Sequence, residues 1–222
     1  GMDWHSSGIT TSVMNALKKS VNLRSQELGI YICGGRGKSS RKTPEELLLV
    51  AEKTGLPGDD LVRSSKLSAK VDNTAVQDGY QLYLHSFVVT VDGEWTVIQQ
   101  GMNPTGRMAR RYHWLSSSIE SFIQEPHTGV CGKNHGLILN LTHADALPTR
   151  SGILELTREN PDRIMREVNL IMPRHHDVRK EDLNMRRPWA ALVPAPKKGV
   201  ADLESMLLLQ GAGPRPLQSL TP

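Results

Sequence analysis

The chain has 222 residues and a mass of 24.6 kDa, enough for one large domain or two small ones around a buried core. Hydrophobic residues make up 38% of the sequence and aromatic residues only 5%, so we expect an ordered, mainly aliphatic core and no coiled coil. Lysine and arginine total 27 against 23 acidic residues, a small excess that permits a nucleic-acid partner without requiring one.

The sequence predicts no membrane partner and no secretion signal, because it has no run of 18 apolar residues and no basic and then apolar leader. Its two cysteines, Cys33 and Cys131, are too few to cross-link a fold of this size or to form a four-cysteine zinc site. Both observations favour a reducing, cytoplasmic location.

Local patterns in the first half of the chain predict helices and strands without regular alternation. Apolar spacing predicts a helix over residues 9–21, and an apolar run at 28–33 predicts a buried strand followed by a glycine-rich loop. The pair Thr43-Pro44 followed by two glutamates is typical of a helix start with threonine as the N-cap, and we expect that helix to end at Gly55. A second helix is expected to run from residue 59 into the eighties.

The clearest local signal is a β-hairpin. Residues 87–91 and 95–100 are rich in strand-forming residues, and Asp92-Gly93 between them is a favoured turn pair. Weaker patterns predict a strand at 137–141 and a helix at 151–158. We therefore expect an α+β fold in which helices surround a small, mainly antiparallel sheet.

A proline-rich connector, VPAPKKG at residues 193–199, divides the chain. We expect a main α+β domain at residues 1–192, the connector at 193–200 and a C-terminal segment at 201–222 that begins with a short helix. That segment resembles a truncated helix-hairpin-helix motif, in which hairpin amides bind a DNA phosphate. Its candidate phosphate-binding residues are Gly211, Gly213 and Arg215, and an ordinary glycine C-cap followed by a tail is the alternative.

Two further stretches carry the positive charge that phosphate binding needs. The loop after the first strand contains four basic residues and no acid: Arg36, Lys38, Arg41 and Lys42. A nucleoside-triphosphate loop needs a glycine five residues before Gly37, where Ile32 stands. Phosphate binding of another kind is therefore one interpretation of this loop, and a solvated basic loop is the alternative. The sequence RMARRYHW at 107–114 interleaves Arg110 and Arg111 with aromatic residues, a composition that suits nucleic acid as well as packing.

The segment 70–81 is unusually polar for a chain that enters a hydrophobic hairpin. Polar groups that point inward need a protein partner, water or a ligand. Lys70, Asp72 and Asp78 are therefore candidate catalytic residues, and a closed hydrogen-bond network in the core is the alternative. Gln99 and Gln100 add to this pattern, because strand alternation turns one of them toward the core.

Histidines and carboxylates supply the candidate ligands of a divalent metal ion. His175, His176 and Asp177 form a dense group, and a loop there would let both histidines reach one ion. With Asp72 and Asp78 in the same cleft they would form a hydrolytic site, in which Lys70 neutralises charge in the transition state. The alternative is a group of surface histidines in a charged loop.

A family resemblance rests on six sequence blocks, at residues 2–13, 29–47, 69–85, 99–103, 109–116 and 172–179. Through these blocks the chain closely resembles a prokaryotic family, domain of unknown function 763, over nearly its whole length. The resemblance implies no established activity. It also implies that family members extend beyond this chain at both ends, with a longer helix-hairpin-helix-like segment.

Together these patterns predict a protein that handles nucleic acid, through DNA binding without sequence preference. The sharper hypothesis is a metal-dependent phosphodiester hydrolase. Cleavage of DNA that requires a metal ion would distinguish it from a protein that only binds DNA. The alternative is a non-catalytic scaffold, or a protein whose buried polar network binds a small ligand or partner. Salt-dependent affinity for DNA would distinguish a binding module from a scaffold.

Overall fold

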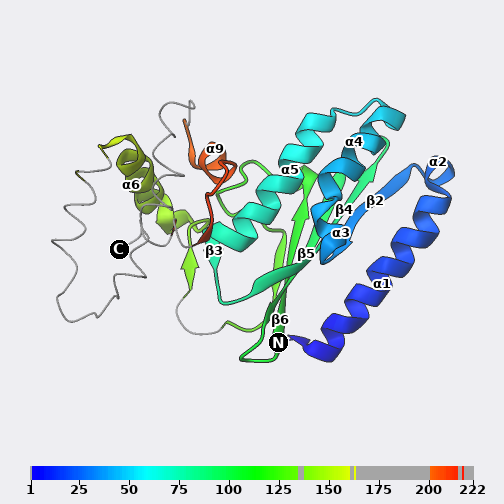
Figure 1. Ribbon diagram of the computed structural model, residues 1–222, viewed down its shortest axis with the longest axis horizontal. Helices are drawn as coiled ribbons and strands as arrows, with labels where there is room; N and C mark the ends of the chain where they lie inside the picture. The colour runs from blue at the N-terminus through cyan, green and yellow to red at the C-terminus, as the bar shows by residue number, and fades with distance from the viewer. Residues whose placement is uncertain (1, 135–137, 161–162, 164–200, 215–216, 218–222) are drawn as a thin grey trace.

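The computed structural model describes residues 2–134, 138–160, 163, 201–214 and 217, except for the side chains of residues 2–7, and has a mixed α+β fold (Figure 1). Its main sheet is antiparallel, with strand order β1-β6-β5-β4-β2 and β7 also paired with β6. The strands are β1 Met2–Asp3, β2 Ile30–Arg36, β4 Gln81–Thr90, β5 Trp95–Asn103, β6 Met108–Leu115 and β7 Gly129–Cys131. A separate two-stranded sheet joins β3, Val76–Gln77, to β8, Leu139–Asn140. The predicted fold class is confirmed.

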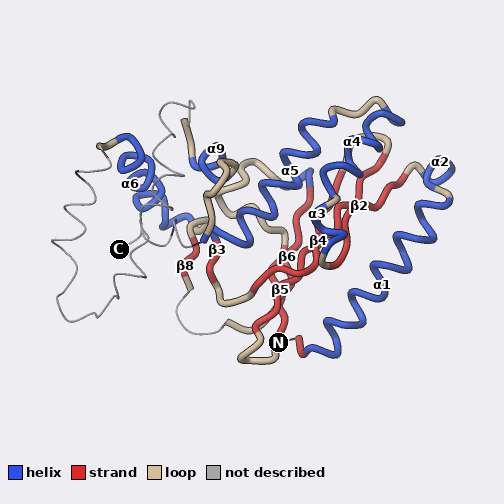
Figure 2. The backbone as a smooth tube through the Cα atoms, in the orientation of Figure 1, coloured by secondary structure: helices blue, strands red, loops and turns tan. Residues whose placement is uncertain are grey.

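Helices surround this sheet unevenly, as Figure 2 shows. They are α1 Trp4–Leu23, α2 Ser25–Leu28, α3 Lys38–Arg41, α4 Thr43–Thr54, α5 Gly58–Lys70, the π-helix η1 Val71–Ala75, the 3₁₀ helices η2 Ser116–Ser118 and η3 Ala144–Ala146, α6 Leu147–Arg158 and α9 Leu203–Leu207. The helices α4 and α5 pack over one face of β2, β4 and β5, and α9 packs on α5. This side holds the core, whose fully buried members include Leu47, Phe87, Val97, Trp114, Met206 and Leu207.

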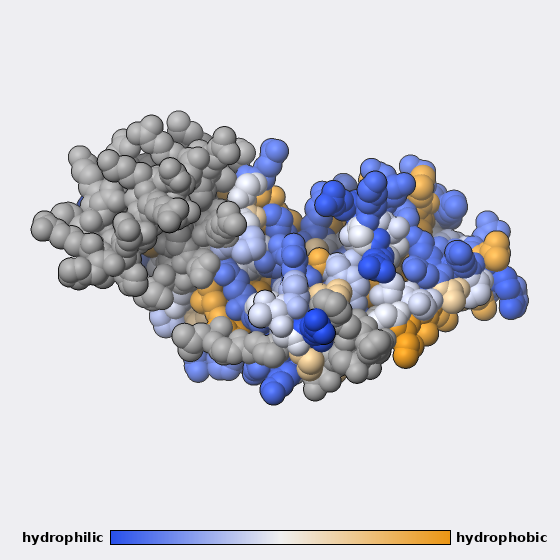
Figure 3. Space-filling model, turned by 60° about the horizontal axis from the view of Figure 1, so that its bottom comes forward, coloured by the Kyte–Doolittle hydropathy of each residue, from blue (hydrophilic) through white to orange (hydrophobic). Residues whose placement is uncertain are grey.

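Helix α1 lies along the exposed edge of β2, where an unpaired strand would otherwise present its backbone to other chains. The Asn22 side chain accepts from the Ile32 amide at 2.9 Å and donates to the Ile32 carbonyl at 2.8 Å. Helix α1 spans the predicted helix, but its apolar stripe is largely exposed: Ile9 66%, Val13 49% and Leu17 43%. In Figure 3 the bottom of the molecule as seen in Figure 1 comes forward, and this face shows small apolar patches among hydrophilic side chains. No described helix is long and apolar enough to cross a membrane.

The predicted hairpin is confirmed and is longer than expected. Val89 pairs with Trp95 and Phe87 with Val97 across β4 and β5. The amide of Thr90 donates to the Glu94 carbonyl at 2.9 Å, and Gly93 takes a φ of +87°, which favours glycine. The turn chemistry therefore set the register correctly.

Two predicted helix boundaries are wrong. The second helix does not continue into the eighties, because it changes to the π-helical turn η1 and the chain enters β4 at Gln81. Helix α4 ends at Gly55 as expected, but its N-cap is Lys42, and Thr43 instead donates its hydroxyl to the Ser40 carbonyl at 2.7 Å. The short helix α3, which begins directly after Gly37, was not predicted.

The C-terminal segment packs against the main body. Its helix α9 is short, as expected, and Leu203 is buried in the same core as the sheet residues. The predicted connector at 193–200 and most of the second half of the hairpin motif, including Arg215, lie outside the described residues.

Candidate functional site

One face of the sheet carries two adjacent rows of buried side chains, an apolar row and a polar row. The apolar row is Phe87, Val97 and Trp114, on β4, β5 and β6. The polar row, two residues away on each strand, is His85, Gln99 and Tyr112. Because α5 and η1 pack over β4, the sheet register sets three hydrogen-bonding side chains in line beneath the end of a helix.

Asp72 lies above the middle of the polar row, on the π-helical turn that ends α5. Its carboxylate is fully buried and accepts from Gln99 Nε2 at 2.5 Å and Trp114 Nε1 at 2.9 Å, while His127 Nε2 lies 2.5 Å from its other oxygen. Burial raises the pKa of Asp72, and the neighbouring His127 opposes this shift in part. Turns of this kind interrupt α-helices frequently at functional sites.

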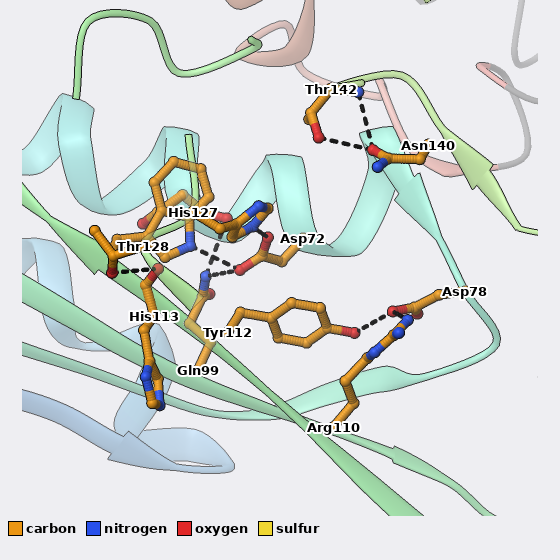
Figure 4. A network of polar contacts seen from close by, with 12 residues as sticks. Asp72, Asp78, Gln99, Arg110, Tyr112, His113, His127, Thr128, Asn140 and Thr142 are labelled. Carbon is orange, nitrogen blue, oxygen red and sulfur yellow. Dashed lines mark hydrogen bonds and ion pairs between the residues drawn. The ribbon is translucent and has the colours of Figure 1, made fainter. Parts of the chain in front are cut away.

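Asp78 closes one end of the polar row, and we call this cluster the Asp78 end. One carboxylate oxygen accepts from Arg110 Nη1 at 2.7 Å and from the Tyr112 hydroxyl at 2.6 Å. The other oxygen accepts from the backbone amide of Tyr80 at 3.1 Å. Burial, followed by the charge of Asp78, raises the pKa of Tyr112, which keeps its hydroxyl a donor. In Figure 4 the carboxylates of Asp72 and Asp78 lie on the same side of the sheet and point at side chains of β5 and β6.

The other end of the row is neutral, and we call it the His85 end. His85 Nδ1 lies 2.8 Å from Gln99 Oε1, and His85 Nε2 lies 2.9 Å from the hydroxyl of Ser65 on α5. Burial lowers the pKa of His85, although the hydrogen bond to Gln99 opposes this shift. A chain of contacts therefore runs from Ser65 through His85 and Gln99 to Asp72.

The His85 end opens into a cleft of about 750 Å³, which we call the basic cleft. Its polar floor includes Ser65, His85 and Gln99, and its rim carries three cations, Arg41, Lys66 and Lys70. No aspartate or glutamate is found among the described residues that line it. A concave site with cations on one side and hydrogen-bonding groups at its floor is suited to an anionic ligand.

The C-terminal hairpin forms one wall of the basic cleft, through residues 208–211. Lys70 Nζ donates to the Ala212 carbonyl at 2.5 Å, and Gln77 Nε2 donates to the Pro214 carbonyl at 3.0 Å. Burial lowers the pKa of Lys70. The polar segment that begins at the end of α5 therefore binds the C-terminal hairpin, which lies more than 130 residues away in sequence.

The structure does not bring all the predicted phosphate-binding residues together. Exposed at or near the cleft are the four cations of the basic loop and the first glycine of the hairpin: Arg36, Lys38, Arg41, Lys42 and Gly211. Arg110 instead is buried in its ion pair with Asp78 and also donates to Asn134, so its guanidinium is committed inside the protein. Arg111 lies on the opposite face of the sheet, where it donates to Thr10 at 2.6 Å. Gly213 lies in the described part of the hairpin, without lining the cleft.

The predicted metal ligands are only partly described. Asp72 and Asp78 project from the same segment, as the sequence led us to expect, but every carboxylate oxygen already has a protein partner. Within the described residues no three histidine, cysteine or acidic side chains are grouped closely enough to hold an ion. His175, His176 and Asp177 lie outside the described residues, so the shared metal site stays a prediction.

Several site residues were missed from the sequence, chiefly Ser65, His85, Tyr112, Trp114 and His127. A signal for His85 was present, because it is in phase with the apolar Phe87 and Val89 and so had to face the core. Two of the missed residues, Tyr112 and His127, also line a smaller hollow of about 220 Å³ near the Asp78 end. Gln100, on the opposite face from Gln99, is fully buried, and its amide has no hydrogen-bond partner among the described residues.

Comparison with known proteins gives one match. No curated protein and no solved structure is significantly similar to the chain. A family model described as a protein of unknown function, DUF763, matches residues 1–221. Since this match covers nearly every residue, the chain belongs to the DUF763 family, as the six sequence blocks led us to expect.

Proposed function

We propose that this protein binds nucleic acid, more specifically DNA, by its phosphates and without sequence preference, and that the basic cleft is the binding surface. The observation that carries this proposal is the one-sided charge of the cleft, where Arg41, Lys66 and Lys70 meet no acidic side chain among the described lining residues. Phosphates are bound in this way by surfaces that read no bases.

Features beside the cleft support the same ligand. The exposed cations Arg36, Lys38 and Lys42 lie next to Arg41 in the chain, so a backbone that enters the cleft would meet further positive charge. The Arg36 guanidinium also lies over the ring of Tyr83, 6.0 Å from its centroid, and this tyrosine lines the cleft, so the charge of Arg36 is held beside it. The hairpin wall at Gly211 adds backbone groups at the rim.

Binding can be tested with labelled duplex and single-stranded DNA in fluorescence anisotropy titrations at several salt concentrations. We expect affinity to fall steeply with salt. The double variant Arg41→Gln/Lys66→Gln should make the slope of log K against log salt shallower by about 1.4–1.8, because two phosphate contacts are lost. Salt-independent affinity, or no binding to either DNA, would overturn the proposal.

A matched control removes the same charge elsewhere. Lys19 on α1 and Lys53 at the end of α4 are exposed and do not line the basic cleft. Lys19→Gln/Lys53→Gln lowers the net charge by the same two units, so it should keep the wild-type slope within about 0.5. Equal effects of the two double variants would mean that the overall charge, and not the cleft, attracts the DNA.

A scaffold is the second candidate, favoured by the saturated hydrogen bonds of Asp72 and Asp78. Groups paired in this way stabilise a fold and leave nothing free to bind a ligand. If the protein bound neither duplex nor single-stranded DNA at low salt, that result would favour the scaffold over the nucleic-acid proposal.

A further inference from the structure

The His85 end brings together a hydroxyl and an imidazole that both face the basic cleft. Ser65 projects from the middle of α5 and His85 from β4, and Ser65 Oγ lies 2.9 Å from His85 Nε2. Ser65 is 3% exposed and His85 6%, yet both line the 750 Å³ cleft. The pair is thus shielded from bulk water on most sides and is open to a ligand on one side.

The surrounding hydrogen bonds determine which ring nitrogen carries the proton. Gln99 Nε2 donates to Asp72 Oδ2 at 2.5 Å and to the Ser68 carbonyl at 3.1 Å, so the amide oxygen of Gln99 must face His85. An oxygen there accepts only from a protonated Nδ1. His85 Nε2 therefore carries the lone pair and accepts the hydroxyl proton of Ser65.

This arrangement has the parts of an activated nucleophile. A serine hydroxyl bonded to an imidazole, whose other nitrogen is oriented by a third group, loses its proton as it attacks. Burial lowers the pKa of His85, so the ring is neutral and can act as a base at neutral pH. The cations at the rim of the cleft, Arg41, Lys66 and Lys70, favour a substrate that is an anion and gains negative charge in the transition state.

We propose that Ser65 and His85 form a nucleophile and general base that cleave a phosphodiester bound in the basic cleft. Ser65 Oγ attacks phosphorus, its proton passes to His85 Nε2, and the bond from phosphorus to the leaving oxygen breaks. The imidazolium returns that proton to the leaving oxygen, which departs as an alcohol. Water then attacks the phosphoserine ester, His85 takes one water proton and gives it to Ser65 Oγ, and the phosphate monoester is released. The choice of a nucleic-acid phosphodiester rests on the proposed function, whereas the reactivity of the pair does not.

The experiment measures both reactivity and turnover in the presence of EDTA, so that metal-dependent cleavage does not contribute. The full chain is incubated with a fluorophosphonate probe, which forms a phosphorus–oxygen bond to an activated serine as the phosphorus–fluorine bond breaks. Peptide mapping should place the adduct on Ser65. Hydrolysis of bis(p-nitrophenyl) phosphate is followed by the absorbance of the released nitrophenolate.

Ser65→Ala should abolish the adduct and reduce hydrolysis at least about 100-fold. Ser64→Ala is the matched control, since it removes a half-buried hydroxyl from the same helix and should change neither signal. His85→Gln, whose amide can keep hydrogen bonds to Ser65 and Gln99, should reduce both signals in a folded protein. Thermal unfolding followed by circular dichroism checks that each variant is folded.

The outcomes separate the two proposals. If wild-type protein binds DNA with a steep salt slope but shows no adduct and no hydrolysis, the nucleophile proposal is overturned and the binding function stands. An adduct on another serine, or hydrolysis that Ser65→Ala leaves intact, also overturns it. If DNA binding fails while Ser65 is labelled and the chromogenic diester is cleaved, the catalytic pair stands and the nucleic-acid ligand is wrong.

Discussion

The two ends of the polar row satisfy buried polar groups in different ways. At the Asp78 end a carboxylate and a guanidinium form a buried ion pair, and the Tyr112 hydroxyl donates to the same carboxylate oxygen. At the His85 end all three groups, Ser65, His85 and Gln99, are linked as neutral donors and acceptors. His85 on β4 pairs with Gln99 on β5, and Gln99 pairs with Tyr112 on β6, so the two ends lie on neighbouring strands of the same sheet.

This difference indicates a structural role for one end and a chemical role for the other. A buried ion pair costs several kcal/mol of lost solvation per ion, so both partners must stay in place, and the cluster serves to fix β6 against the segment that carries Asp78. A neutral chain costs less to bury and leaves a basic nitrogen beside a hydroxyl. Only the His85 end opens into the basic cleft, and for that reason we place the chemistry there and the structural role at Asp78.

The largest expected effect tests the structural role. Asp78→Ala removes the acceptor of both Arg110 and Tyr112 and leaves a buried cation without its partner, so we expect a loss of about 3–5 kcal/mol in the free energy of unfolding. Urea unfolding followed by tryptophan fluorescence measures it. The double variant Asp78→Leu/Arg110→Met should recover at least half of the loss, because it removes both members of the buried ion pair.

An exposed ion pair provides the control for this prediction. Arg24 and Glu27 form a pair on the surface at 2.5 Å, with more than 60% of each side chain exposed. Glu27→Ala should leave the urea midpoint unchanged, because solvent screens such pairs. If Asp78→Ala were as mild as Glu27→Ala, the Asp78 end would not hold the strands.

The second prediction concerns the packing that supports the His85 end. Gly34 on β2 has a φ of +84°, and a Cβ atom there would lie 2.3 Å from the His85 carbonyl oxygen and 2.5 Å from Thr43 Oγ1. Gly34→Ala should therefore lower the free energy of unfolding by about 2–4 kcal/mol, through strain and overpacking together. Gly37→Ala, also at positive φ but with open space around its Cβ, should cost only about 1 kcal/mol. Equal losses in urea unfolding would show that backbone strain alone matters, and that the close approach to His85 does not.

The parts of the fold that were predictable from sequence depend on local chemistry. The turn at Asp92-Gly93 and the end of α4 at Gly55 are determined by a few neighbouring residues, and both were predicted correctly. The end of α5 was not, because nothing in the local spacing indicates that a π-helical turn will direct Asp72 inward. That turn is stabilised by Gln99 and Trp114, which lie 27 and 42 residues away.

The candidate site shows the same limit. We predicted correctly that the buried polar groups of segment 70–81 need hydrogen-bond partners. Which residues supply them depends on the register of β5 and β6, and this was not predictable from local sequence. Ser65 carried no sequence signal, since a serine within a helix is ordinary until His85 is known to lie opposite. We predicted that Arg110 binds nucleic acid because the stretch around it is rich in arginine and aromatic residues. Its position in β6 instead directs its side chain toward Asp78.

The smallest expected effect is a pH dependence that belongs to the His85 end. Burial lowers the pKa of His85 in the folded protein below its ordinary value of 6.5, so below pH 6.5 the unfolded chain binds the proton more readily than the folded one. The stabilising contribution is therefore complete above pH 6.5 and is lost as the pH falls toward the lowered folded-state pKa. Wild-type protein should lose free energy of unfolding between pH 7 and pH 5, and His85→Gln should lose about 1 kcal/mol less over this range. His143→Gln, at an exposed histidine outside the polar row, should retain the wild-type slope. If urea unfolding at several pH values gave parallel curves for wild type and His85→Gln, His85 would not be held neutral, and the lone pair assigned to Nε2 would be lost with it.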